Sequence, residues 1–335
     1  MLQFCTLFNT NYLSRGVAMY HSLEQHCKDF HLYIVAFDNN CLEVLNKLNL
    51  TNATVISLEE FENPALLAVK SERTAGEYCW TCASSSIKYC IETFSIDHCT
   101  YVDADLLFFS DPKVLINEMG MNSVLITPHR YTPCYDQSAT SGIYCVQFMT
   151  FKNTLEGMTV LNWWVDSCLE WCFNRFEDNK FGDQKYLDDW TERFAGVYVS
   201  THSGGGIAPW NIQQFSFACK TGVTKVKHED DVEETDLIFY HYHGFSYCSD
   251  KRYRISPASY LLQKKQISHV YKPYVKALSV AENAIANLQT DVVPYETNDE
   301  FDQIKRVIGR YIVFFFKGYY KNIYAKHFFQ YGLFN

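Results

Sequence analysis

The sequence predicts an α/β fold built on a Rossmann-like, mainly parallel sheet with helices on both of its faces. Over the first 100 residues, apolar runs of strand length alternate with segments of helical periodicity, and this alternation is typical of a parallel sheet. Two aspartates, Asp103 and Asp105, then follow an apolar run directly. They stand at the carboxyl end of a predicted strand, which is where such sheets bind their ligands.

The elements of the first half follow in order from their periodicity. We expect a buried strand from Leu2 to Phe8 and a helix from Leu13 to Cys27, where apolar residues recur at helical spacing. Further strands are expected at residues 30–37, 54–58 and 99–102, with helices at residues 42–48 and 78–94. No Gly-x-Gly-x-x-Gly follows the first strand, so the fingerprint of a dinucleotide site is missing.

The second half is more mixed. We expect a strand at residues 143–151, a Trp-rich helix at 155–175, a shorter helix at 183–194 and a short strand at 237–240. The three glycines at 204–206 are expected to form a mobile loop or an ordinary turn. From residue 256 onward the pattern is helical and polar. We therefore expect a main domain at residues 1–255 and a C-terminal helical region at residues 256–335.

The composition limits the class of protein. With 335 residues and 47% hydrophobic residues, the chain can form a large core. A net charge of −9 argues against a nucleic-acid-binding protein, which needs a broad basic surface. Asn9, Asn11 and Arg15 interrupt the N-terminus before the apolar core of a signal peptide could form. The 13 scattered cysteines fit reduced thiols better than a disulfide framework, and the prediction is a cytoplasmic protein.

The stretch YVDADLLFF (residues 101–109) places two carboxylates inside an apolar run. Ionised carboxylates are rarely buried unless something pairs with them, and side chains at i and i+2 of an extended chain point the same way. No Lys or Arg lies nearby in the sequence, so a hard divalent cation is a natural partner. The alternative is a strand end whose aspartates cap the next turn. Residues 106–109 are expected to continue the sheet that holds these carboxylates.

Five short segments occur in one order along the chain: LFNTNYL (7–13), YVDADLLFFSDP (101–112), TSGIYCVQF (140–148), GDQKYL (182–187) and HYHG (241–244), with APWN (208–211) as a candidate sixth. In this order they resemble the GT-A-fold, retaining glycosyltransferases of family 8, of the bacterial surface-glycan type, which use UDP-sugars. The resemblance covers residues 2–250. It implies a GT-A catalytic domain with a nucleotide-sugar half at residues 1–112 and an acceptor half at residues 113–255.

The resemblance also implies a role for individual residues. Those expected to bind the nucleotide-sugar donor are Leu7, Asn9, Asn11, Tyr12, Lys88, Asp103, Ala104, Asn211 and Gly244. A Mn²⁺ or Mg²⁺ ion would be held by Asp103, Asp105 and His241, and Asp183 and Gln184 would contact the transferred sugar. His243 is the alternative third ligand, because on an extended segment it points the same way as His241. Asp183 has an alternative role as the cap of the helix that follows Gly182.

Three departures from the family pattern affect the choice of donor. Asn9 stands where the family has an Asp. The helix before the two aspartates lacks the family's Arg, for which Lys88 is the candidate substitute. The Lys-Pro-Trp that follows the family's C-terminal His is absent. The donor's base and sugar therefore stay open.

The family's retaining outcome has two routes: a covalent intermediate on a carboxylate, or front-face attack in which the leaving phosphate takes the acceptor proton. No carboxylate is marked by the sequence as a nucleophile, so we favour the second route. The alternatives to a glycosyltransferase are a nucleotidyltransferase that makes nucleotide sugars and a catalytically inactive glycan-binding protein. The oligomeric state is not predicted.

The last segment, residues 304–334, is basic and aromatic in an acidic chain. It has six Lys and Arg residues and no Asp or Glu, and its apolar run at 311–316 is too short to span a bilayer. It is expected to form a helix, lying either in the interface of an anionic membrane or packed on the protein. The membrane interpretation predicts peripheral contact with the inner face of the membrane and an acceptor linked to a lipid.

Overall fold

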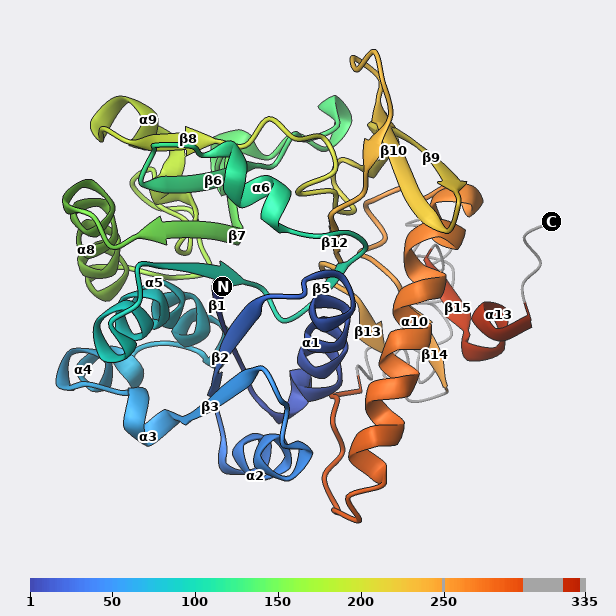
Figure 1. Ribbon diagram of the computed structural model, residues 1–335, viewed down its shortest axis with the longest axis horizontal. Coiled ribbons are helices and arrows are strands. Elements are labelled where there is room, and N and C mark those ends of the chain that lie inside the picture. Colours follow the sequence, from blue (N-terminus) through green and yellow to red (C-terminus); the bar gives the residue numbers. More distant parts are fainter. Residues whose placement is uncertain (249–250, 298–321, 332–335) are drawn as a thin grey trace, which may run out of the picture.

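The computed structural model describes residues 1–248, 251–297 and 322–331, and its core is a seven-stranded sheet (Figure 1). The strand order is β3-β2-β1-β4-β7-β6-β8. Each neighbouring pair is parallel except the two that β7 makes, with β4 and with β6. This confirms the predicted mainly parallel sheet. The strands are β1 (Leu2–Phe8), β2 (Phe30–Ala36), β3 (Ala53–Ser57), β4 (His98–Val102), β6 (Val124–Pro128), β7 (Tyr144–Lys152) and β8 (Val197–Val199).

Helices cover both faces of this sheet (Figure 1). On one face lie α1 (Leu13–His26), α2 (Asn39–Leu48), α6 (Lys113–Glu118) and α10 (Lys264–Ala286). On the other lie α3 (Leu58–Phe61), α4 (Pro64–Lys70), α5 (Ala75–Phe94), α8 (Leu155–Glu170) and α9 (Trp190–Arg193). Side chains of β1 alternate between the two layers, with Phe4 and Phe8 in one and Cys5 and Leu7 in the other, as the pleat of a strand requires.

Most predicted elements are confirmed to within a few residues. The Trp-rich helix is shorter than predicted, because α8 ends at Glu170 and Trp171 is already extended. The predicted helix at 183–194 is only a 3-10 turn (Lys185–Asp189) followed by the single turn α9. The short helix α7 (Ser138–Ser141) was not predicted.

Residues 106–109 do not continue the main sheet, so that expectation is wrong. Strand β5 (Leu106–Phe108) instead pairs with β12 (Phe239–His241) in a separate two-stranded sheet. The pairing is antiparallel and sets His241 opposite Leu106. A segment from the end of the main domain is thereby brought directly beside the two aspartates.

Two further antiparallel sheets lie outside the core. One is formed by β9 (Phe215–Lys220), β10 (Val223–His228) and β11 (Thr235–Asp236), and the other by β13 (Ser246–Tyr247), β14 (Arg252–Arg254) and β15 (Ile323–Ala325). Strand β15 lies in the region that was predicted to be helical throughout, and α13 (Lys326–Tyr331) follows it. The remainder of the predicted membrane-facing segment at 304–334 lies outside the described residues. Of the helices that the structure describes, none is long and apolar enough to cross a bilayer.

Helix α10 lies alongside α1 and braces the segment that follows β12 (Figure 1). The rings of Tyr242 and Tyr274 are stacked with centroids 3.5 Å apart. The hydroxyl groups of Tyr240 and Tyr271 are 3.0 Å apart, within hydrogen-bonding distance. The helix therefore packs directly on the His241 segment, while the predicted domain boundary at residue 255 stays a prediction.

Candidate metal centre

The structure brings Asp103, Asp105 and His241 together at the carboxyl edge of the sheet. One ligand atom from each lies within 4.8 Å of the others. Nε2 of His241 is 3.3 Å from Oδ1 of Asp105 and 3.8 Å from Oδ2 of Asp103. The two aspartates lie between β4 and β5, and the β5–β12 pairing supplies the histidine.

The imidazole of His241 is held in one orientation. Its Nδ1 is 2.8 Å from Oε1 of Gln147, which can only accept a hydrogen bond, so Nδ1 carries the proton and Nε2 faces the carboxylates. The ring of Trp210 packs edge-on against the same imidazole, with centroids 5.4 Å apart. The backbone of Gln147 is also fixed, because its carbonyl accepts from the amide of Asp103 at 3.1 Å.

His243 is not part of this cluster. Its side chain is exposed, and its ring centroid lies 5.8 Å from that of His241 and 5.4 Å from that of Trp210. The geometry therefore favours His241 over His243 as the third ligand.

The charges of the cluster depend strongly on one another. The charge and hydrogen bond of His241, acting against burial, lower the pKa of Asp105 to about 2. Burial and the charge of Asp105 raise the pKa of Asp103 to about 6, although His241 opposes this. The charge and hydrogen bond of Asp105 outweigh burial and raise the pKa of His241 well above its ordinary value. Without a metal ion, the site is therefore an imidazolium ion paired with carboxylate.

Of the two predicted sugar contacts, Asp183 lies close enough to the cluster to feel the charge of Asp103. Burial and then the negative charge of Asp103 raise the pKa of Asp183 to about 8, and its carbonyl accepts a 2.9 Å hydrogen bond from the indole of Trp164. Gln184 donates to the carbonyl of Ser141 at 2.7 Å. The alternative role of Asp183 as a helix cap is wrong, because Gln184 holds the cap position and no side chain caps this turn.

The predicted donor segment after β1 is tightly organised. Oδ1 of Asn9 accepts from the amide of Asn11 at 3.1 Å and begins a 3-10 turn (Thr10–Tyr12). Asp38 accepts from the amide of Thr10 at 2.7 Å. Tyr12 is 42% exposed, so its ring is free to contact a ligand. Leu7 lies in β1 and is buried.

Arg15 and Gln147 are two residues of the site that sequence reasoning missed. The buried guanidinium of Arg15 lies 4.1 Å from the ring centroid of Tyr12, and it donates to the carbonyls of Asn11 and Phe245 at 3.1 and 3.0 Å. It thereby joins the donor segment to the segment after His241. The available signal was that Arg15 is the only Lys or Arg among the first 27 residues, and that Gln147 is the one amide in the apolar run of β7.

The structure does not favour the predicted contact of Lys88 with the donor. Lys88 forms an ion pair of 3.9 Å with Glu92, on the same helix. Cys79 is a residue of α5 that lies near the site. Burial and the charge of Asp103 raise the pKa of its thiol to about 12. Lys88 is nine residues further along α5, which is about 13 Å of helix axis.

Asn211 supports the backbone, and the structure does not favour its predicted contact with the donor. Its side chain is fully buried. Its two N–H groups donate to the carbonyls of His129 and Gly206 at 2.8 and 2.9 Å, and its Oδ1 accepts from the amide of Ala208 at 2.9 Å. No N–H of the Asn211 amide is left for a ligand.

Ala104 and Gly244, two of the residues predicted to bind the donor, occupy positions where the structure leaves little room for a larger side chain. Ala104, between the two aspartates, is 6% exposed. Gly244 has φ +72, and a Cβ there would lie 2.6 Å from Cδ of Pro257, so only glycine suits this position.

The glycines at 204–206 form no mobile loop. All three are buried, and a Cβ added at Gly204 would lie 1.9 Å from the carbonyl oxygen of Asp236. Such close packing against the backbone holds this segment beside β12, where the carbonyl of Gly204 accepts from the amide of Ile238 at 2.9 Å.

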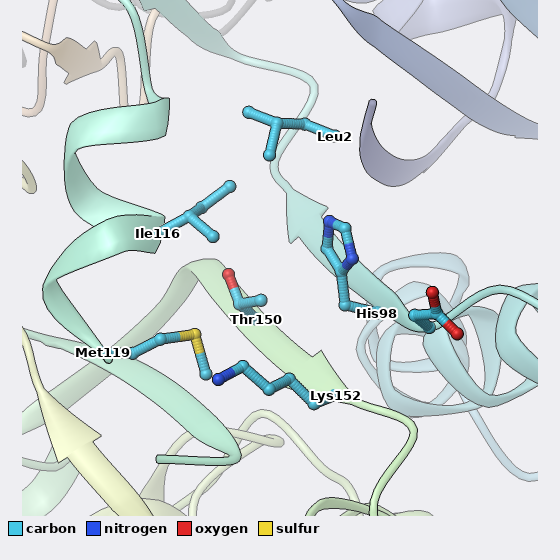
Figure 2. A pocket seen from close by; sticks show the side chains of 7 residues that line it. Leu2, His98, Ile116, Met119, Thr150 and Lys152 are labelled. Atoms are coloured by element: carbon cyan, nitrogen blue, oxygen red, sulfur yellow. The ribbon is translucent and has the colours of Figure 1, made fainter. Parts of the chain in front are cut away.

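A cavity of about 220 Å³ lies elsewhere, at the opposite edge of the sheet (Figure 2). His98 begins β4 and Lys152 ends the reversed strand β7, so both are at the edge opposite to the one that Asp103 follows. The lining residues are Leu2, Asp97, His98, Ile116, Met119, Thr150 and Lys152. The cavity is therefore separate from the carboxylate cluster.

Comparison with known proteins gives both sequence relatives and structural neighbours. The chain matches no protein-family model. It is 32% identical to the uncharacterized protein YfnD of Bacillus subtilis (strain 168) over 279 residues, which is 81% of this chain and 87% of YfnD. It is 31% identical to the uncharacterized protein YfnF of the same organism over 297 residues, covering 86% and 94% of the two chains.

The structural neighbours include two glycosyltransferases. One is the galactosyltransferase LgtC in complex with donor and acceptor sugar analogs, with a TM-score of 0.49 and 12% identity over 86% of this chain and 97% of LgtC. The other is mouse xyloside xylosyltransferase 1, with a TM-score of 0.43 and 12% identity over 72% of this chain and 97% of that one.

Proposed function

The chain belongs to the same protein family as YfnD and YfnF of Bacillus subtilis, and we propose that it is a metal-dependent glycosyltransferase. It moves a sugar from a nucleoside-diphosphate donor to a glycan or glycolipid acceptor. The resemblance to family 8 supports a UDP-sugar and a role in surface-polysaccharide assembly. The observation that carries the proposal is the Asp103–Asp105–His241 cluster with Asp183 beside it.

The three side chains of the cluster fit Mn²⁺ or Mg²⁺. Carboxylate oxygens suit either ion, and an imidazole nitrogen moves the preference toward Mn²⁺. The side chains of Asp103 and Asp105 are 27% and 14% exposed, so an oxygen of a ligand can approach them from solvent. An ion held there would offset the negative charge that develops on a leaving diphosphate.

Asp183 and Gln184 are proposed to contact the transferred sugar. With a pKa of about 8, Asp183 is mostly a neutral acid at pH 7, which donates a hydrogen bond to a sugar hydroxyl but is a poor nucleophile. This supports front-face attack over a covalent intermediate on a carboxylate. The expected product is α-linked when the donor is α-linked.

A nucleotidyltransferase is disfavoured by the segment after β1. Such an enzyme needs a glycine-rich, basic loop that cradles phosphates. Here the turn is held by Asn9 and Asp38, and the Arg15 guanidinium donates to two backbone carbonyls. An inactive glycan-binding protein would have no need of paired carboxylates that face a histidine.

One set of assays separates these candidates. UDP binding that requires Mn²⁺, with release of UDP from a UDP-sugar when an acceptor is present, supports the transferase. Formation of a nucleotide sugar from a nucleoside triphosphate would show the nucleotidyltransferase, and glycan binding without turnover would show the inactive protein. The anomeric proton of the product, observed by NMR, reports retention, and a β-linked product would reject it.

The proposed acceptor on a lipid depends on the basic residues at 304–334. Each Lys or Arg near an anionic surface contributes about 1 kcal/mol. Flotation with anionic vesicles compares the full chain with a chain shortened at residue 302. Equal partitioning of the two would remove the support for peripheral membrane contact.

A further inference from the structure

Three thiols meet in the core between α5 and the sheet, away from the candidate metal centre. Cys5 is on β1, Cys90 on α5 and Cys99 on β4, and all three are fully buried. Their Sγ atoms lie within 4.8 Å of one another. In the residues that the structure describes, the only other group of this kind is the Asp103–Asp105–His241 cluster.

A hydroxyl group completes the surroundings of the thiols. Oγ of Ser86 donates to the carbonyl of Ala83 at 2.7 Å and lies 3.7 Å from Sγ of Cys5. The hydroxyl group of Ser86 therefore borders Cys5. Three sulfur atoms bound to one ion at about 2.3 Å are about 4 Å apart, so the cluster needs only a small contraction to hold an ion.

The charge of the complex decides which ion the cluster can hold. Burial raises the pKa of Cys90 and Cys99 well above the ordinary value, so both are protonated thiols at neutral pH. Burial acts the same way on Cys5, but its hydrogen bonds with Cys90, Cys99 and Ser86 outweigh burial and lower the pKa of Cys5 to about 5. The groups that act on the three thiols are other thiols and Ser86, with no cation of the described residues among them. A monovalent or divalent ion on three thiolates leaves a net negative charge, which is costly in an apolar core. A trivalent ion on three thiolates leaves no net charge.

We propose that Cys5, Cys90 and Cys99 form a binding site for a trivalent thiophilic metalloid, with arsenite as the probe. Arsenous acid, As(OH)₃, reacts with three thiols to give As(S–Cys)₃ and three molecules of water. Three As–O bonds break and three As–S bonds form, the protons of Cys90 and Cys99 and one proton from solvent leave with the three hydroxides as water, and no oxidation state changes. The acid is small and uncharged at neutral pH, so it enters when α5 opens locally from the sheet. The site is independent of the proposed glycosyltransferase activity.

The test uses the full chain, reduced, with the substitution Cys168→Ala. This substitution removes the competing pair of buried thiols, Cys168 and Cys172. Mass spectrometry after incubation with arsenite should show a gain of one arsenic less three hydrogens. An adduct on two thiols would retain a hydroxide and be heavier. A chain that gains no arsenic, or gains only the heavier adduct, would overturn the proposal.

Two variants locate the adduct. Cys90→Ala should abolish the three-thiol adduct, whereas Cys41→Ala, which removes an equally buried cysteine on α2, should keep it. Arsenite should also raise the melting temperature of the unsubstituted chain, because the folded state holds the three thiols together and should bind arsenite more tightly than the unfolded chain does; this measurement still applies if Cys90→Ala fails to fold. Stoichiometric zinc in the purified chain that is lost in Cys90→Ala would overturn the charge argument.

Discussion

Gln147 accepts the Nδ1 proton of His241 at 2.8 Å, and this single hydrogen bond turns the other ring nitrogen toward the two carboxylates. Replacing Gln147 with Leu should lower the affinity for Mn²⁺ by about 10- to 100-fold, because the imidazole loses its fixed tautomer and orientation. Gln147→Glu keeps an acceptor at the same place and should retain most of the affinity. Titration of Mn²⁺ by calorimetry checks both, and equal affinities for wild type and Gln147→Leu would contradict the assignment.

Asp105→Ala should abolish Mn²⁺-dependent binding of UDP and leave the fold intact. The carboxylate supplies one of three candidate ligand atoms and is also the carboxylate closest to His241. Asp136→Ala is the matched control, because that aspartate is exposed and distant in sequence from the cluster. Calorimetric titration of UDP with and without Mn²⁺ measures the effect. A variant that binds UDP as tightly as wild type, with the same Mn²⁺ dependence, would remove Asp105 from the site.

The affinity for Mn²⁺ should rise with pH. In the ion-free site the pKa of His241 is raised well above its ordinary value, so the imidazole keeps its proton at neutral pH. An ion can bind Nε2 only when that proton leaves. Binding should therefore be weaker at about pH 6 than at about pH 8 and should release protons into the buffer.

The stability of the ion-free protein has the opposite dependence on pH. A raised histidine pKa stabilises the fold fully below the unfolded value of about 6.5, and this contribution is lost as the pH rises through the folded-state pKa.

Calorimetry of Mn²⁺ binding in two buffers of different ionisation heat counts the protons that the binding releases. His241→Gln should release fewer, and equal Mn²⁺ affinity at the two pH values would refute the ion pair.

Gly204→Ala should destabilise the fold by about 1–3 kcal/mol. The added Cβ would lie 1.9 Å from the carbonyl oxygen of Asp236, which is backbone and cannot rotate away. Gly76→Ala is the control, because nothing lies within 4 Å of its Cβ and alanine favours a helix over glycine by up to about 1 kcal/mol. Urea unfolding compares the two, and equal midpoints would contradict the close packing of Gly204.

The sequence predicted what depends on local pattern. Strands β1 to β4 were located because apolar runs alternate with helical periodicity, and Asp103 and Asp105 were found because charges at the end of an apolar run need a partner. Strand β12 is three residues long, and so short a strand has no periodicity that shows its partner. The register that places His241 opposite Leu106 was therefore invisible in the sequence.

The roles of the remaining residues depend on tertiary geometry, which the sequence does not show. Lys88 was chosen for its charge, but its distance from the site depends on how far along α5 it lies. Asn211 matched a motif, yet the backbone uses both of its N–H groups. Gln147 escaped notice because an amide in a strand becomes informative only when a neighbouring strand shows what it bonds.

The stacking of Tyr242 on Tyr274 also has a consequence for the order of events during synthesis. Asp103 and Asp105 leave the ribosome long before His241, and the tyrosines of α10 that brace the His241 segment leave later still. A nascent chain halted after His241 and before Ala286 has all three candidate ligands but lacks the complete helix α10 that supports the third. Since the chain is made from its N-terminus, its candidate ion-binding site is completed only after α10 has been synthesised.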